Sequence, residues 1–252
     1  RSERLAAIGQ TMTGLAHESR NAFQRSQAAL ETLSLELEGR PAAVKLVERI
    51  QRAHDHLLHL YEEVLQFARP VRLDLQLVSL TALIQQTWEH IQQVGNEKSV
   101  SLELQVGPTM ELFADPFALE QVFRNLLENA MEASQRDASI EISVRDQWVG
   151  VDRGVGLEVR DFCIGHSAEA IARIFEPFYT TRSRGTGLGL PIARRLVESH
   201  GGTLDLYRAE PGVVAVVALP LQARPFEYAD ATTTTDYRRP AVPGEPAAPV
   251  RP

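Results

Sequence analysis

The sequence predicts a helical hairpin followed by a two-layer α/β sandwich and an irregular tail. Three observations support this prediction. The first 68 residues carry apolar positions spaced by three and four, with one break at a glycine and a proline. Residues 75–220 alternate between short β-prone runs and helical patterns. Residues 222–252 are rich in proline and have no sustained periodicity, which favours a disordered tail or a linker.

The hairpin is predicted from two helical patterns and the short break between them. The segment 3–38 lacks proline, and its heptad-like seam consists of Leu5, Ile8, Met12, Leu15, Ser19 and Ala22. At the break, Gly39 can end one helix and Pro41 can begin the next. The pattern resumes over 42–68 at Val47, Ile50, His54, Leu57, Tyr61, Val64 and Ala68. Two long helices joined by so short a turn run antiparallel.

One hairpin cannot bury the apolar stripes of both of its helices. We therefore expect two copies of the chain to pair into a four-helix bundle, as a homodimer through residues 5–68.

Strand and helix patterns alternate after the hairpin. Strands are predicted at 75–80, 100–106, 139–145, 156–161, 202–209 and 212–220, and helices at 80–93, 116–135 and 187–200. This order predicts one mixed sheet with helices on one face. The resulting division of the chain is a hairpin at 1–70, a sandwich at 71–221 and a tail at 222–252.

Composition excludes several classes of function. The chain has 252 residues and a net charge of −7, which argues against a nucleic-acid-binding surface. A single cysteine, Cys163, rules out an internal disulfide and fits a reducing, cytoplasmic setting. No apolar run approaches the roughly 20 residues of a membrane helix, so this segment implies no membrane contact, although the full-length protein could be tethered.

A histidine with a carboxylate beside it lies inside the first helix, in "GLAHESRNAF" at 14–23. Counted from Leu5, His17 falls at the outermost heptad position, with Glu18 next to it and Asn21 one turn on. A neutral ring nitrogen can attack a phosphate, and a neighbouring carboxylate can accept the ring proton. The alternative is an exposed histidine on a polar helix face. Metal binding is disfavoured because the second histidine of HExxH is missing.

Three further segments carry candidate nucleotide-binding residues. In 121–134, Asn125 and Asn129 share one helix face, where carboxamides can hold Mg²⁺ and phosphate oxygens; otherwise they are surface residues. Asp161, in "DFCIG", can accept a hydrogen bond from an adenine amine. "GTGLGL" at 185–190 opens a helix with alternating glycines, whose backbone N–H groups suit an anion, although most glycine-rich segments are only turns.

Taken together, these segments resemble bacterial sensor histidine kinases. "AHESRN", "NLLENA", "DFCIG", "FEPFYTT" and "GTGLGL" occur in the order of that family's H, N, G1, F and G2 boxes, over about residues 5–220. The resemblance implies a dimeric helical hairpin and an ATP-binding domain of the Bergerat type, shared with gyrase and Hsp90. It also implies ATP and Mg²⁺ as cofactors and a response-regulator receiver domain as partner.

The resemblance implies a role for each matching residue. His17 would be the phosphoacceptor and Glu18 its acid/base, while Asn21 would position water when a phosphorylated response regulator is dephosphorylated. Asn129 would ligate Mg²⁺, with Asn125 beside it at the phosphates, and Asp161 would bind adenine. Gly165 would be a lid hinge, and Arg182 would reach the terminal phosphate. The remaining nucleotide-binding positions would be Thr181, Gly185, Thr186, Gly187, Leu188 and Gly189.

The sequence departs from the family at the G1 and H boxes. In place of the usual DxGxG, Phe162, Cys163 and Ile164 follow the aspartate, so the first glycine of the motif is replaced by Cys163. In the H box, Ala22 replaces the usual proline. A literal DxGxG occurs at 152–156, but its spacing from "IFEPF" excludes it as the G1 box, and we expect a strand-joining turn there. The altered G1 box motivates a second hypothesis, a degenerate nucleotide-binding or scaffolding dimer. A GHKL-type ATPase or serine kinase is a third, but these lack the histidine-bearing hairpin.

Overall fold

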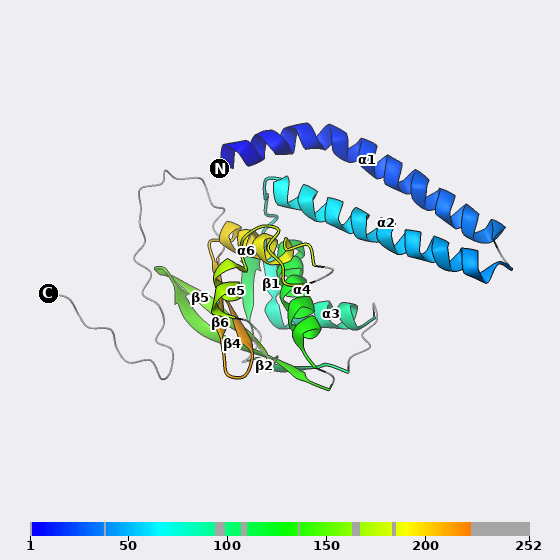
Figure 1. Ribbon diagram of the computed structural model, residues 1–252. Helices are drawn as coiled ribbons and strands as arrows, with labels where there is room; N and C mark the ends of the chain where they lie inside the picture. The colour runs from blue at the N-terminus through cyan, green and yellow to red at the C-terminus, as the bar shows by residue number, and fades with distance from the viewer. Residues whose placement is uncertain are drawn as a thin grey trace.

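The computed structural model describes residues 2–37, 39–93, 99–106, 110–135, 137–162, 167–182 and 185–222; the side chains of residues 2–17 and of Val106 are not part of this description. Two long helices, α1 (Ser2–Glu36) and α2 (Pro41–Ala68), run antiparallel, as expected (Figure 1). Gly39 has a φ of +87°, and Pro41 occupies the first turn of α2. These are the two residues that predicted the break.

Aromatic side chains hold the hairpin together where α1 and α2 face each other. The ring of Phe23 lies 5.4 Å from that of His54 and 5.6 Å from that of Tyr61. Val47 is buried. Two residues of the predicted seam of α2, Ile50 and Leu57, are more than half exposed on a single hairpin. A hairpin therefore leaves an apolar stripe on α2 uncovered, as the spacing of these residues predicted.

The main sheet of the sandwich has five strands in the order β2-β4-β5-β7-β6. Their bounds are β2 (Ser101–Val106), β4 (Ser139–Val149), β5 (Asp152–Asp161), β6 (Thr203–Arg208) and β7 (Val213–Pro220). β2 pairs parallel with β4 and the other neighbours pair antiparallel, so the predicted mixed sheet is confirmed. Alternate residues such as Ile142, Val159 and Val217 are buried on one face, which is the period-two pattern that identified these strands.

The predicted first strand does not belong to this sheet. β1 (Gln76–Ser79) pairs antiparallel with β3 (Glu111–Ala114) in a separate two-stranded sheet. The prediction of a single sheet was therefore wrong, and it missed β3. At four residues, β3 is too short to show a clear alternation. It contacts the segment just after β7 through the Phe113 amide, which donates to the carbonyl of Leu221 at 2.9 Å.

The expected turn at 152–156 is also wrong, because these residues begin β5. The turn lies just before them, at Gly150, which has a φ of +61°. Gly154 is required by packing rather than by a turn: a Cβ there would lie 2.5 Å from the carbonyl oxygen of Leu219 in β7. A glycine inside a strand permits this close approach.

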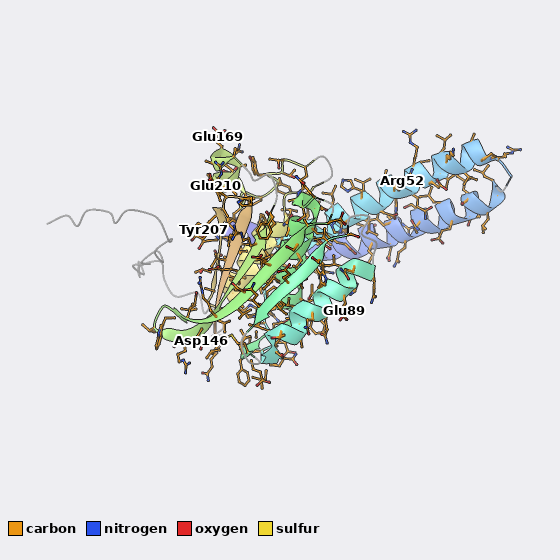
Figure 2. All side chains as sticks on the ribbon, turned by 90° about the horizontal axis from the view of Figure 1, so that it is seen from below. Arg52, Glu89, Asp146, Glu169, Tyr207 and Glu210 are labelled. Atoms are coloured by element: carbon orange, nitrogen blue, oxygen red, sulfur yellow. The ribbon has the colours of Figure 1, made fainter. Side chains whose placement is uncertain are left out.

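Among the described residues, four helices accompany the strands: α3 (Leu80–Gln93), α4 (Pro116–Ala133), α5 (Ala168–Arg173) and α6 (Gly189–Ser199). The sequence predicted all but the six-residue α5. α4 and α6 lie side by side over the sheet (Figure 1). The core between these layers includes Phe123, Leu127 and Leu157, all fully buried. Figure 2 shows Glu169 of α5 and Glu210 near one end of the sandwich, with Asp146 of β4 toward the other.

Asp115 joins three parts of the sandwich. Its Oδ1 accepts from the Ala118 amide at 3.0 Å and caps α4, while its Oδ2 accepts from the Asp74 amide at 2.9 Å. Its own amide donates to Nε2 of His200 at 3.1 Å. His200 is fully buried and donates from Nδ1 to the carbonyl of Leu196 at 2.7 Å, because a carbonyl can only accept.

Acid should destabilise the sandwich through His200. Burial lowers its pKa below the usual 6.5, against smaller opposing effects of the Leu196 carbonyl and Asp115. As the pH falls below about 6.5, the unfolded chain takes up a proton that the native state resists, so the free energy of unfolding should fall. Urea unfolding between pH 7.5 and 5 measures this slope. The slope should be shallower in His200→Gln but unchanged in His90→Gln, an exposed site on α3; equal slopes in all three proteins would contradict the prediction.

The hairpin contacts the sandwich through the last turns of α2. The Arg195 guanidinium of α6 donates to the carbonyl of Phe67, and the side-chain amide of Gln66 donates to that of Gln121 on α4. Val64 and Phe67 pack against the core of the sandwich. Within the described part of the chain, no helix has the length and apolar character needed to cross a bilayer.

Candidate functional site

A cavity of about 690 Å³ opens beside α4, α5 and α6 above one end of the sheet. Its volume lies in the range of small-molecule sites, roughly 300–1,000 Å³. Nearly all of the described residues predicted to bind nucleotide line it: Asn125, Asn129, Asp161, Thr181, Arg182, Gly185, Thr186, Gly187 and Gly189. Residues from four separate segments of the sequence therefore meet in one cavity.

α4 presents its two asparagines to this cavity. Helical spacing turns Val122, Leu126 and Ala130 into the core and leaves Asn125 and Asn129 half-exposed on the other face, as predicted. The Nδ2 group of Asn125 is buried and has no hydrogen-bond partner among the described residues. An unpartnered buried donor is costly, so a phosphate oxygen in the cavity would fit this position.

Asp161 is the last residue of β5 and its side chain is buried against β7. Its Oδ1 accepts from the Val213 amide at 3.1 Å, and the two residues are direct partners across the strands. This contact fixes the carboxylate at the edge of the cavity. The neighbouring cavity wall is apolar and comes from Val159, Leu206 and Ala215 on three adjacent strands. An apolar wall with one carboxylate suits a flat base that carries an amine.

The segment between α5 and α6 folds tightly around Gly187. Gly187 has a φ of +70°, and a Cβ there would lie 2.6 Å from the backbone carbonyl carbon of Phe178. Phe178 also has a positive φ, of +66°, and its amide donates to the carbonyl of Gly187 at 3.1 Å. Glycine is required where backbone segments approach this closely. Gly189 begins α6 against α4, since a Cβ there would lie 3.1 Å from Oδ1 of Asn125.

Arg182 extends from this segment to α4. Its Nη1 donates to Oδ1 of Asn129 at 2.5 Å and to Oε2 of Glu132 at 2.6 Å, and its Nη2 donates to the backbone carbonyl of Asn129 at 2.9 Å. The Thr180 hydroxyl accepts from the Arg182 amide at 3.1 Å.

Several predicted site residues lie elsewhere. The Leu188 side chain is fully buried in the core and does not line the cavity. Glu18 and Asn21 are exposed on α1 and do not line the cavity, whereas the His17 side chain lies outside the described residues. Cys163, Ile164 and Gly165 also lie outside them.

Phe162 does not line the cavity. Its ring stacks under the guanidinium of Arg160, which lies 4.9 Å from the ring centre. Within the described part of the chain, Phe162 therefore does not block the cavity.

Sequence reasoning missed three glutamates and one histidine at the cavity. Glu128 and Glu132 share a face of α4 with Asn125 and Asn129, so helical spacing could have identified them. Burial raises the pKa of Glu128; Arg124 and His59 lower it, whereas Glu132 and Glu63 raise it further. His59 and Glu63 come from α2, and no sequence signal places this helix beside the cavity.

Comparison with known proteins identifies similar chains. Residues 114–223 match the family model described as histidine kinase-, DNA gyrase B-, and HSP90-like ATPase. The sensor histidine kinase ZraS of Escherichia coli strain K12 is 31% identical over 211 residues, which make up 83% of this chain and 44% of that protein. The chain therefore spans less than half the length of this relative.

Two solved structures extend the similarity to the hairpin. Full-length ShkA in complex with AMPPNP has a TM-score of 0.67 and 25% identity, and the match covers 89% of this chain and 47% of that one. Histidine kinase ThkA in complex with response regulator protein TrrA has a TM-score of 0.62 and 24% identity, over 87% of this chain and 63% of that one. The predicted fold class, a helical region followed by an ATPase-type sandwich, is confirmed.

Proposed function

Because the chain belongs to the sensor histidine kinases of bacterial two-component systems and carries their catalytic region, we propose that it uses ATP to phosphorylate its own His17 and passes the phosphoryl group to a response-regulator aspartate. The convergence of motif residues on one cavity carries this proposal. The division of labour follows the chain, with a phosphotransfer hairpin at 1–70, an ATP-binding domain at 71–221 and a tail or linker at 222–252.

In this proposal, Asp161 accepts from the adenine amine while the apolar wall of the sheet contacts the ring. Asn125 donates through its unpartnered Nδ2 to a phosphate oxygen. The backbone N–H groups of the glycine-rich segment at 185–189 surround the phosphates. Gly165 serves as the lid hinge. Thr181, Thr186 and Leu188 are the remaining proposed nucleotide-binding residues.

Asn129 is the proposed ligand of Mg²⁺, and it lines the cavity. An amide oxygen suits a hard cation and adds no negative charge beside the phosphates. The metal ion would neutralise charge on the phosphate oxygens during transfer. Arg182 is the proposed contact of the terminal phosphate.

Phosphoryl transfer requires positioning of the two reactants more than covalent help from the protein. A neutral ring nitrogen of His17 attacks the terminal phosphorus, and the bond from that phosphorus to the oxygen of ADP breaks. Glu18 accepts the proton that the ring loses. Asn21, on the same helix face, would position water for dephosphorylation of the regulator. Glu18 and Asn21 are exposed, which supports access for a partner.

Incubation with γ-labelled ATP and Mg²⁺ tests the proposed kinase. Acid-labile label should accumulate on the wild type, and it should be absent in His17→Gln and in Asn129→Ala. His56→Gln, an exposed histidine on α2, is the matched control and should label normally. Label that persists at the wild-type level in His17→Gln would overturn the assignment of the phosphoacceptor.

The altered G1 box supports one alternative, a scaffolding dimer that signals by conformation and transfers nothing. Calorimetry with Mg·ATP separates the two functions. Affinity in the micromolar-to-millimolar range supports the kinase, whereas absence of binding that Cys163→Gly restores supports the alternative.

Dimerisation should depend on the uncovered stripe of α2. Leu46, Ile50 and Leu57 are 57%, 52% and 56% exposed and follow heptad spacing, which suits a helix partner from a second copy. The double variant Ile50→Glu/Leu57→Glu should therefore be monomeric by light scattering at micromolar concentration, whereas the wild type should be dimeric. Val151→Glu adds a charge at an exposed apolar residue outside the hairpin and should leave the dimer intact. A monomeric wild type would contradict the prediction.

A further inference from the structure

The hydrogen bonds that Arg182 makes to α4 conflict with the role proposed for Asn129 as a ligand of Mg²⁺. Its guanidinium donates to the amide oxygen of Asn129 at 2.5 Å. This is the atom proposed above to ligate Mg²⁺. A divalent cation and a guanidinium cannot share one amide oxygen at these distances, because two positive charges would then lie within contact of each other.

Glu132 supplies the negative charge that keeps Arg182 at Asn129. Its Oε2 accepts from the same Nη1 atom at 2.6 Å, in an ion pair in which the arginine side chain is 32% exposed and the glutamate 59%. Nη2 adds a third hydrogen bond, to the Asn129 carbonyl at 2.9 Å. Three charge-assisted hydrogen bonds from one guanidinium fix its position on the helix.

The backbone near Arg182 is also constrained. The Thr180 hydroxyl accepts from the Arg182 amide, and a Cβ at Gly185 would lie 2.6 Å from that hydroxyl oxygen and 3.2 Å from Cβ of Arg182. The arginine therefore projects from closely packed backbone toward α4, with little freedom to relocate unless the ion pair breaks.

We infer that Glu132 is a positioning residue that holds Arg182 on α4 as an internal cation, so that Arg182 and the divalent cation of a metal–nucleotide complex compete for the amide oxygen of Asn129. This inference rests on the proposed function. Binding of the metal complex releases the guanidinium from Asn129, and the Glu132 carboxylate sets the cost of that release. The released arginine is then available to a terminal phosphate.

Calorimetry with Mg·ADP tests the competition, since ADP lacks the terminal phosphate that Arg182 would contact. Glu132→Gln should bind Mg·ADP roughly two- to fivefold more tightly than the wild type, the effect expected from loss of a partly exposed ion pair. The gain in affinity of Glu132→Gln should be smaller when EDTA removes the metal, because metal-free ADP does not need the Asn129 oxygen. Arg182→Ala should show the same metal-dependent gain.

A double-mutant cycle separates this effect from simple removal of a negative charge near an anion. In the Arg182→Ala background, Glu132→Gln should add no further gain. Glu198→Gln is the matched control, because Glu198 is 55% exposed, pairs with Arg194 at 2.9 Å and does not line the cavity. Its affinity for Mg·ADP should equal that of the wild type.

An equal gain from Glu132→Gln with and without Arg182 would overturn the inference and leave the proposed function intact, as would a gain independent of metal. If the wild type binds neither Mg·ADP nor Mg·ATP, both the inference and the proposed function fail.

Discussion

Gly212→Ala should lower the free energy of unfolding by more than about 4 kcal/mol, among the largest effects expected for a single methyl group. Gly212 has a φ of +96°, and a Cβ there would lie 1.8 Å from the carbonyl oxygen of Asp161 and 2.8 Å from its carbonyl carbon. That carbonyl belongs to β5, which pairs with β4 on one side and β7 on the other. The clash cannot be relieved without separating the paired ends of β5 and β7, at the central strand of the sheet.

A second glycine with a left-handed backbone conformation separates the effect of the clash from that of conformational strain. Gly150 has a φ of +61°, and a Cβ there would meet nothing within 4 Å. Gly150→Ala should therefore cost only about 1–2 kcal/mol, the penalty of a left-handed conformation. Urea unfolding followed by circular dichroism measures both variants. Equal losses at the two positions would show that the close approach to Asp161 contributes nothing.

Asp161→Asn should weaken Mg·ATP binding by roughly 10- to 100-fold, as expected when a hydrogen bond to a charged group is lost. The Val213 amide donates to Oδ1 of Asp161 and would keep the amide oxygen of the asparagine in the same place. The NH₂ group would then face the cavity. In the proposed function this group would meet the amine of adenine, so that two donors oppose each other.

The same variant should improve the relative binding of GTP, because guanine has a carbonyl where adenine has the amine. Calorimetry with both nucleotides measures this ratio, and the unfolding curve of the variant shows that the fold is retained. Asp205 lies on β6 but does not line the cavity, so Asp205→Asn should change neither affinity. Undiminished ATP affinity in Asp161→Asn would exclude the proposed contact with adenine.

Periodicity was sufficient to predict the long elements of the fold. The hairpin breaks at Gly39 and Pro41 as predicted, and α4 begins at Pro116, the predicted start of its helix. Short elements escaped because four residues of β3 and six of α5 contain too few periods to be distinguished from loops. The segment at 152–156 was misassigned for another reason. Its two glycines resemble a turn, but Gly154 is needed where β5 closely approaches β7, which only the tertiary structure reveals.

The candidate site was predicted to the extent that its residues lie in contiguous motifs. Asn125, Asp161 and the glycine-rich segment each have a local signal, and the structure brings them to one cavity. His59 and Glu63 have no such signal, because they line the cavity only through the docking of α2 on the sandwich. The acidic residues of α4 were within reach of the same helical spacing that identified the asparagines.

The contacts of Asp115 restrict where the hairpin can change its angle to the sandwich. The Asp74 amide is bound to the same carboxylate that caps α4, and Val71 and Leu73 pack against the core. Only Arg69 and Pro70 separate the end of α2 from this anchored stretch, and the proline ring fixes one of their dihedrals. A twist of the hairpin must therefore be absorbed by the backbone of Arg69 and Pro70. Otherwise the hairpin and the sandwich rotate together, and the twist reaches α4, which carries the asparagines.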